Sequence, residues 1–172
     1  LKGGAISKGD KVKVEIDTER RQSITCNHSA THLLHEALRL VLGDHVEQRG
    51  SMVDGDRFRF DFSHDTSVSA EEIRKVENIV NMEIMRNKKV VTTSMSMEEA
   101  QKKGARALFG EKYGDVVRVV NIGEDFSVEL CGGTHVNRSG EIGLVKVALE
   151  TSVASGISCL LYTSPSPRDG TK

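Results

Sequence analysis

The chain has 172 residues, of which 37% are hydrophobic, with 24 Lys and Arg against 25 Asp and Glu. This near-neutral balance excludes the strongly basic surface of an autonomous nucleic-acid binder, so any polyanionic partner would be held by local contacts. No apolar run approaches the roughly 20 residues that a membrane-spanning helix needs, and three cysteines are too few for a disulfide scaffold. We therefore expect a cytoplasmic protein with no membrane partner.

The N-terminal third begins with a strand pattern and continues with a helix pattern. Residues 11–16, "KVKVEI", alternate charged and apolar side chains, which is typical of a half-buried strand. We interpret residues 1–24 as the end of a β subdomain and a connector. Residues 27–43 predict a helix, with Asn27 as the N-cap and Gly43 as the stop.

The predicted helix has two different faces. Leucine and alanine side chains recur at helical spacing and gather on one face, which can pack on a core. At about 100° per residue, His28, His32 and His35 fall within roughly 60° of one another on the opposite face. The histidine face is therefore available for a different contact.

The rest of the chain alternates between strands and helices. In order, it predicts a hairpin at Asp54-Gly55, a helix from Ser69 to about Arg86, a strand over 88–95, a short helix from Ser96 to near Gly104, and strands over 115–122, 126–130 and 142–150. Both helices open with a capping box, a serine followed three residues later by a glutamate. We predict an α+β fold over residues 25–157, with an antiparallel or mixed sheet covered on one side by helices.

The C-terminal residues 158–172 have a different character. They contain both prolines of the chain among serines and threonines, and they follow neither the strand period nor the helix period. We interpret this segment as a disordered or non-native tail and leave Cys159 out of any site.

Two pairs of residues suggest a metal site. His28 and His32 are spaced at i and i+4, so their imidazoles project from the same helical face. Cys131 and His135 frame the glycine loop of "ELCGGTHV". Together they form a His₃Cys set, which suits tetrahedral zinc. Each pair alone also has an ordinary interpretation, as helix surface or as a glycine turn.

The remaining histidines and cysteines have ordinary interpretations. His35 shares the histidine face one turn further along, where packing or support of a ligand is expected. His45 and His64 are expected at the surface, and Cys26 is expected to be a small buried apolar group.

Three stretches carry a resemblance to a known family. "NHSATHLLHEALRLVLGDHVEQRGSMVDGDRFRFDFSH", "GARALFGEKYGD" and "ELCGGTHVNRSGEIG" resemble the editing domain of bacterial alanyl-tRNA synthetases, and the likeness covers about residues 1–157. After "SGI" the family continues with a basic strand, whereas this chain reads "SCLLYTSPSPRD". The departure supports a foreign tail.

The resemblance implies a function and its partners. It implies hydrolysis of tRNA(Ala) wrongly charged with serine or glycine, with zinc held by His28, His32, Cys131 and His135. It implies that residues 1–24 end a truncated β-barrel and that the other domains of a synthetase are partners. ATP and Mg²⁺ would serve only an aminoacylation domain outside this stretch.

The resemblance also implies roles for residues beside the metal. Thr31 and Gln48 would face the substrate and help to recognise or process it. A site that hydrogen-bonds a hydroxyl discriminates by about 10⁴ to 10⁵, whereas an apolar pocket rejects an added hydroxyl by only about 10². The amides of Gly132 and Gly133 would donate to developing negative charge. Cys131 belongs to both the metal-ligating and the catalytic set, as a metal-bound thiolate rather than a nucleophile.

Several alternatives remain open on the sequence. Thr31 also fits an ordinary helix residue that bonds its own backbone, and Gln48 fits a solvated strand residue. Arg106 and Lys112 are candidate contacts to the tRNA backbone, although charged loop residues are usually solvated. The chain also fits a free-standing editing protein, or a non-catalytic module in which zinc only joins helix to sheet.

Overall fold

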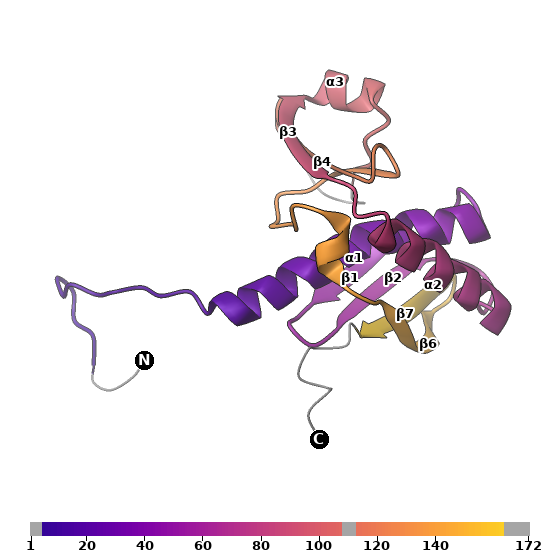
Figure 1. Ribbon diagram of the computed structural model, residues 1–172, viewed down its shortest axis with the longest axis horizontal. Helices are drawn as coiled ribbons and strands as arrows, with labels where there is room; N and C mark the ends of the chain where they lie inside the picture. Colours follow the sequence, from indigo (N-terminus) through magenta and orange to yellow (C-terminus); the bar gives the residue numbers. More distant parts are fainter. Residues whose placement is uncertain (1–4, 108–112, 164–172) are drawn as a thin grey trace.

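The computed structural model describes residues 5–107 and 113–163 and confirms an α+β fold (Figure 1). Its elements are α1 (Thr18–Leu42), β1 (Gln48–Val53), β2 (Phe58–Ser63), α2 (Ala70–Met85), β3 (Val90–Ser96), α3 (Met97–Lys102), β4 (Val116–Ile122), β5 (Ser127–Leu130), η1 (Ser139–Ile142), β6 (Lys146–Ala154) and β7 (Ile157–Thr163). Within these described ranges, no helix is both long and apolar enough to cross a membrane.

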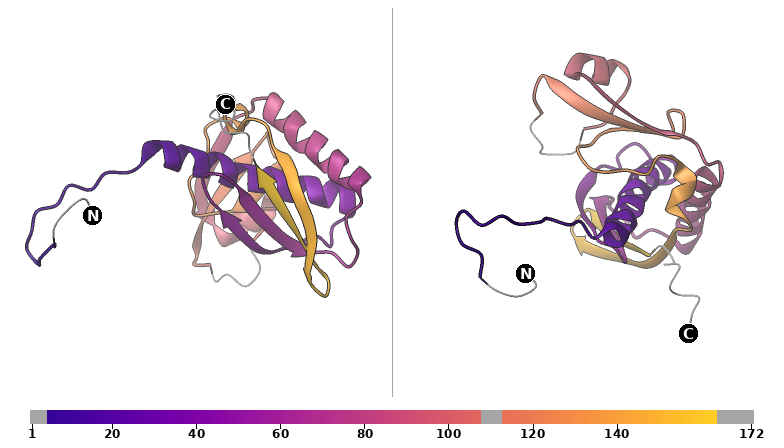
Figure 2. Two further views of the ribbon diagram at one scale, coloured as in Figure 1. Left: turned by 90° about the horizontal axis from the view of Figure 1, so that it is seen from below. Right: turned by 60° about the vertical axis from the view of Figure 1, so that its left-hand side comes forward.

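The strands form two separate antiparallel sheets. One has the order β1-β2-β7-β6 and carries α1 and α2 on one face, while the other has the order β3-β4-β5 and carries α3 (Figures 1 and 2). Helix α1 lies between them, because its side chains contact both Phe60 of β2 and Glu129 of β5. The sequence predicted helices over one side of a sheet, and the structure adds a second sheet across α1.

The main core forms between the four-stranded sheet and its two helices. In β2 the side chains of Phe58, Phe60 and Phe62 are fully buried, while the residues between them face outward. These inward positions follow from the period of two along a strand. The leucine face of α1 packs in the same cluster, which includes Leu33 and Leu34. The expected core face of α1 is therefore confirmed.

Helix α1 is longer than its sequence pattern suggested. It begins after Asp17, whose side chain accepts a hydrogen bond from the amide of Arg20 at 3.0 Å. Asn27, the expected N-cap, instead lies inside the helix and is fully buried. Its Nδ2 donates to the carbonyl oxygens of Asp54 at 2.7 Å and Gly55 at 3.2 Å, so it anchors the β1–β2 turn. Asn27 is of a residue type that often caps helices, but here its side chain makes a tertiary contact instead.

The other helix signals are confirmed. Helix α1 ends at Gly43, which has a φ of 117° that favours glycine. The capping boxes predicted at Ser69 and Ser96 are both present and open α2 and α3. The predicted hairpin also forms, with β1 and β2 joined through residues 54–57.

The strand predicted over residues 11–16 is not formed. Val12, Val14 and Ile16 are exposed by 58%, 84% and 60%, and the segment is irregular up to Asp17. A strand needs a neighbour to receive its backbone hydrogen bonds, and none of the described strands pairs with this segment. The alternating pattern alone therefore did not produce a strand.

The prediction of a disordered tail from residue 158 is wrong for residues 158–163. They form most of β7, which is hydrogen-bonded to β2 on one side and β6 on the other. Leu160 and Tyr162 point into the main core and are 1% and 0% exposed. Pairing on both edges supplies the hydrogen bonds that local sequence periodicity did not reveal. Residues 164–172 lie outside the described residues.

Candidate metal centre

The structure brings the four predicted ligand residues together. One ligand atom from each of His28, His32, Cys131 and His135 lies within 4.8 Å of all the others. The Cys131 Sγ is 3.4 Å from His28 Nε2 and 3.3 Å from His135 Nε2. Nitrogen and sulfur ligands around a tetrahedral zinc lie about 3.3–3.6 Å apart, so the cluster has the right size. The role of these residues as zinc ligands stays a prediction.

The histidine face of α1 is covered rather than solvent-exposed. His32 and His35 are only 5% and 6% exposed, because β5 and the loop after it lie over them. The rings of His28 and His135 are 4.4 Å apart between centroids, and those of His32 and His135 are 4.8 Å apart. The face opposite the leucines therefore meets the second half of the cluster.

A buried carboxylate orients one of the helix histidines. Glu129 of β5 is 2% exposed, and its Oε2 and Oε1 lie 2.7 Å from His32 Nδ1 and 2.9 Å from His35 Nδ1. With Nδ1 facing the carboxylate, the Nε2 of His32 is the nitrogen left for an ion. Glu129 was not predicted from the sequence, although an acidic residue inside the mostly apolar "FSVEL" strand was a usable signal.

The same contact shifts the pKa values of both groups. Burial by itself would lower the pKa of His32, but the charge of Glu129 opposes this and raises it to about 10. Burial would likewise raise the pKa of Glu129, but the charge of His32 and hydrogen bonds from both imidazoles hold it well below its usual range. The ion-free pair is thus an imidazolium facing a carboxylate.

Ser29 orients His135 in a similar way. Its Oγ donates to the carbonyl of Thr25 at 2.9 Å and accepts from the amide of Val136 at 3.1 Å. The single hydroxyl proton is therefore used, so the His135 Nδ1, 3.2 Å away, must be the donor in its contact with this oxygen. That tautomer leaves the His135 Nε2 lone pair facing Cys131. Burial also lowers the pKa of His135, which favours the neutral ring.

Cys131 is poised to be a thiolate. Burial would raise the pKa of its thiol, but the imidazoles of His135, His28 and His32 around the sulfur outweigh burial and lower the pKa to about 3. The thiolate is the form of cysteine that binds metal. By contrast, burial raises the pKa of Cys26, and it raises that of Cys159 to about 11. Only Cys131 among the three cysteines has this environment.

The two glycines of the loop are not equivalent. A Cβ built on Gly133 would lie 2.1 Å from Cε1 of His28, so a side chain there would collide with a ligand ring. A Cβ on Gly132 would meet nothing within 4 Å. Arg118 of β4 also contacts this loop, because its Nη1 donates to the carbonyls of Cys131 at 2.6 Å and Gly133 at 2.7 Å. Arg118 was not predicted from the sequence.

Thr31 and Gln48 each have a hydrogen-bond partner within the chain. The Thr31 hydroxyl is on a buried side chain and donates to the carbonyl of Asn27 at 2.9 Å. Gln48 begins β1, and its Nε2 donates to the Ser51 hydroxyl at 3.1 Å. Their proposed roles toward a substrate stay predictions.

The other expected surface groups have local partners. The imidazoles of His45 and His64 contact each other at 2.9 Å; His45 is exposed and His64 is half-buried. Arg106 forms an ion pair with Glu36 of α1, so its charge is already compensated. Lys112 lies outside the described residues.

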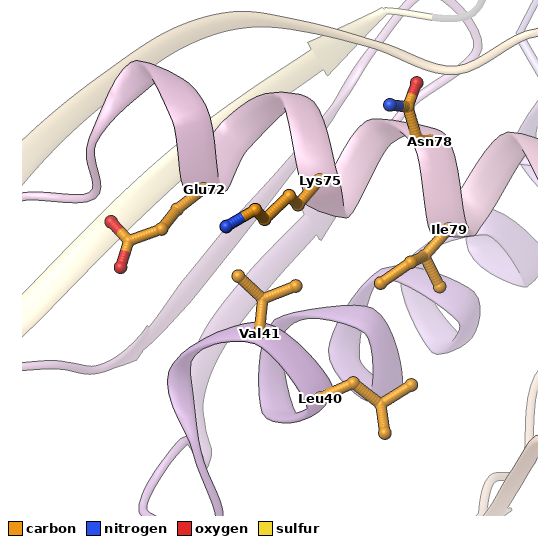
Figure 3. Close-up of a pocket in the computed structure, with 6 residues that line it drawn as sticks. All are labelled: Leu40, Val41, Glu72, Lys75, Asn78 and Ile79. Carbon is orange, nitrogen blue, oxygen red and sulfur yellow. The ribbon is translucent and has the colours of Figure 1, made fainter.

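A shallow hollow of about 500 Å³ between α1 and α2 is separate from the metal cluster (Figure 3). Its lining residues are Leu40, Val41, Glu72, Lys75, Asn78 and Ile79. None of them is a predicted ligand, so the metal cluster rather than this hollow is the candidate site.

Part of the cluster lies in a stretch that is similar to a known family. Residues 117–158 match the family described as "Threonyl and Alanyl tRNA synthetase second additional domain". Cys131 and His135 lie inside this match, whereas the helix pair lies before it. The matched stretch is thus similar to an additional domain that two kinds of tRNA synthetase share.

Alignments over a longer stretch of the chain are with alanine-tRNA ligases, one of these two kinds of synthetase. The chain is 56% identical over 158 residues to the alanine-tRNA ligase of Dichelobacter nodosus, which covers 91% of this chain and 18% of that protein. It is 60% identical over 147 residues to the alanine-tRNA ligase of Colwellia psychrerythraea, covering 86% of this chain and 17% of that protein. The resemblance to alanyl-tRNA synthetase is confirmed, and the chain spans less than a fifth of these relatives.

Proposed function

We propose that this chain is a zinc-dependent editing domain that hydrolyses the aminoacyl ester of tRNA(Ala) mischarged with serine or glycine. The observation that carries the proposal is the His₃Cys cluster, in which Glu129 and Ser29 already orient two of the imidazoles toward the ion position. The similarity to alanine-tRNA ligases supports tRNA(Ala) as the partner. The biological role is quality control in protein biosynthesis.

The need for such a site follows from the chemistry of alanine. A pocket shaped for alanine cannot strongly reject serine, because an added hydroxyl costs only about 10²-fold in selectivity. Glycine is smaller than alanine and can enter the same pocket. A second site that hydrolyses the wrong product restores accuracy. This division of labour gives the domain a reason to bind an aminoacyl ester rather than a free amino acid.

The reaction breaks one ester bond. The oxygen of a water molecule adds to the ester carbon, and the carbonyl π electrons move onto the carbonyl oxygen. When the carbonyl re-forms, the bond to the ribose oxygen breaks and a proton from the water ends on that oxygen. Bound zinc would supply Lewis-acid polarisation beside the ester. The chain's own residues hold the ligands, and the amides of the loop can donate to the transient oxyanion.

The proposal predicts a metal-dependent deacylation. The zinc-loaded chain should release serine and glycine from Ser-tRNA(Ala) and Gly-tRNA(Ala) faster than alanine from Ala-tRNA(Ala), as followed by loss of acid-precipitable label. Cys131→Ala and His32→Ala should abolish both zinc binding and release. His64→Ala is the matched control, because it removes an imidazole away from the four ligands. Full activity of both ligand variants without bound metal would refute the proposal.

One observation favours a second candidate, a non-catalytic module in which zinc joins α1 to the second sheet. Four protein ligands complete a tetrahedral shell, and closed shells are typical of structural zinc. In that case chelation would unfold the chain, while every mischarged tRNA(Ala) would stay intact. A free-standing editing protein is the other alternative, and the gene sequence on both sides of this stretch would decide it.

A further inference from the structure

Arg118 holds the ligand loop through two backbone carbonyls. It lies in β4 directly opposite the start of the loop, because the amide of Cys131 donates to the Arg118 carbonyl at 3.0 Å. Its Nη1 then donates to the carbonyl oxygens of Cys131 and Gly133, at 2.6 and 2.7 Å. One guanidinium nitrogen therefore fixes the direction of two peptide groups that are two residues apart.

The guanidinium is dedicated to this contact. Its remaining interaction is a long one, 3.5 Å from Nη2 to the Thr92 hydroxyl. In the part of the chain that the structure describes, Arg118 has no carboxylate partner, whereas Arg39 and Arg106 each form an ion pair with an acidic side chain. Hydrogen bonds from a charged donor are roughly twice as strong as neutral ones, so the two peptide groups are firmly oriented.

The direction of the carbonyls determines the direction of the next amides. Every peptide bond in the described chain is trans, so each C=O is antiparallel to the N–H of the following residue. The carbonyls of Cys131 and Gly133 point at Arg118. The N–H groups of Gly132 and Thr134 therefore point away from it.

These two amides are available to a ligand. Gly132 and Thr134 are exposed, and neither N–H has a hydrogen-bond partner among the residues that the structure describes. Both lie between the candidate ligands Cys131 and His135. Backbone N–H groups held in advance are effective donors to developing negative charge, because no reorganisation is needed when the charge appears.

We propose that Arg118 is a positioning residue that turns the amides of Gly132 and Thr134 toward the substrate, where they donate to oxygens of the tetrahedral species formed during ester hydrolysis. The inference rests on the proposed editing function and deepens it. It differs from the expectation from sequence, which assigned the amides of Gly132 and Gly133. The Gly133 N–H shares its peptide group with the carbonyl of Gly132. It is therefore not oriented by the two carbonyls that accept hydrogen bonds from Arg118.

The kinetic test compares two arginines with the same contact. Arg39 also donates from Nη1 to two carbonyls two residues apart, those of Asp44 at 2.7 Å and Val46 at 3.0 Å, at the far end of α1. Arg118→Lys should lower kcat for Ser-tRNA(Ala) by about 10²-fold with little change in KM, as expected for the loss of an oxyanion donor. Arg39→Lys should leave kcat within about twofold of the parent, because its carbonyls are remote from the loop. Both variants should retain one zinc per chain.

A binding test does not depend on turnover. The probes are two stable adenosine derivatives, a 3′-seryl phosphonate with a tetrahedral anion in place of the ester carbonyl, and a 3′-seryl amide with a planar neutral carbonyl. In proton-nitrogen correlation spectra of the zinc-loaded chain, the phosphonate should shift the Gly132 and Thr134 amide signals far more than the amide does. Arg118→Lys should weaken phosphonate binding by at least about tenfold and leave amide binding within about twofold.

The outcomes separate this inference from the proposed function. Unchanged kcat in Arg118→Lys, or a phosphonate that shifts Gly133 in place of Gly132 and Thr134, would overturn the inference while deacylation stands. If the parent chain leaves Ser-tRNA(Ala) intact, the proposed function fails, and the spectra still report whether the two amides receive an anion. If Arg118→Lys weakened the binding of the phosphonate and of the amide equally, Arg118 would have only a structural role. That result would also overturn the inference.

Discussion

The two halves of the metal centre are held in place by different means. His28 and His32 sit on a 25-residue helix whose opposite face is buried in the main core, so their relative position follows from helix geometry. Cys131 and His135 sit in a loop, where side chains from other elements set the backbone. The helix half is therefore robust to local change, whereas the loop half depends on a few specific contacts.

The largest effect is expected from Gly133, with Gly132 as its control. Gly133→Ala should weaken zinc binding by more than about 100-fold, because the new Cβ would overlap the His28 ring. Gly132→Ala should bind zinc like the parent, since its Cβ would meet nothing within 4 Å. Competition with a chromophoric chelator measures both. Equal affinities of the two variants would show that the loop adapts as easily as a surface turn.

A smaller effect is expected from the carboxylate that orients the helix half. Glu129→Gln should weaken zinc binding by about 10–100-fold, because it replaces the charge that faces His32 Nδ1. Glu83→Gln is the matched control, because Glu83 is also buried and charge-paired, with Arg86, but contacts none of the four ligands among the described residues. Both variants should lose stability in a thermal melt, and only Glu129→Gln should lose zinc affinity.

The pH dependence of alkylation can be compared between Cys131, which lies in the loop half, and Cys26. Because the pKa of Cys131 is lowered to about 3, its thiolate is fully formed from pH 5 to 8, and alkylation by iodoacetamide should proceed at a constant rate. The pKa of Cys26 is raised, so its alkylation should rise about tenfold per pH unit over the same range. Peptide mapping of the zinc-free chain measures both rates. Added zinc should protect Cys131 alone, and a Cys131 rate that rises with pH would contradict its thiolate state.

The smallest effect is expected at Ser29, the only direct link between α1 and His135 Nδ1 in the described structure. Ser29→Ala removes the acceptor that selects the tautomer, so zinc affinity should fall by about tenfold. Ser23→Ala removes a hydroxyl that only bonds the helix backbone at Glu19, and zinc affinity should not change. A loss of zinc affinity in both variants would indicate a general effect on α1 rather than an effect on the His135 tautomer.

Much of this could be predicted because the signals are local. The capping boxes at Ser69 and Ser96 and the stop at Gly43 depend on residues a few positions apart, and all three are present. The His28 and His32 spacing likewise needs only the helical period. The strand at residues 11–16 and the disorder of residues 158–163 were predicted wrongly, because strand formation depends on a partner that local periodicity does not identify.

The sequence by itself determined which four side chains are able to bind a metal and the two short spacings that pair them. Only the tertiary structure decided that the pairs meet, because about a hundred residues, including strands β1 to β5, separate them along the chain. It also decided which nitrogen each buried imidazole offers and which amides the loop exposes. Those choices come from Glu129, Ser29 and Arg118, whose contacts exist only when distant segments are packed against one another.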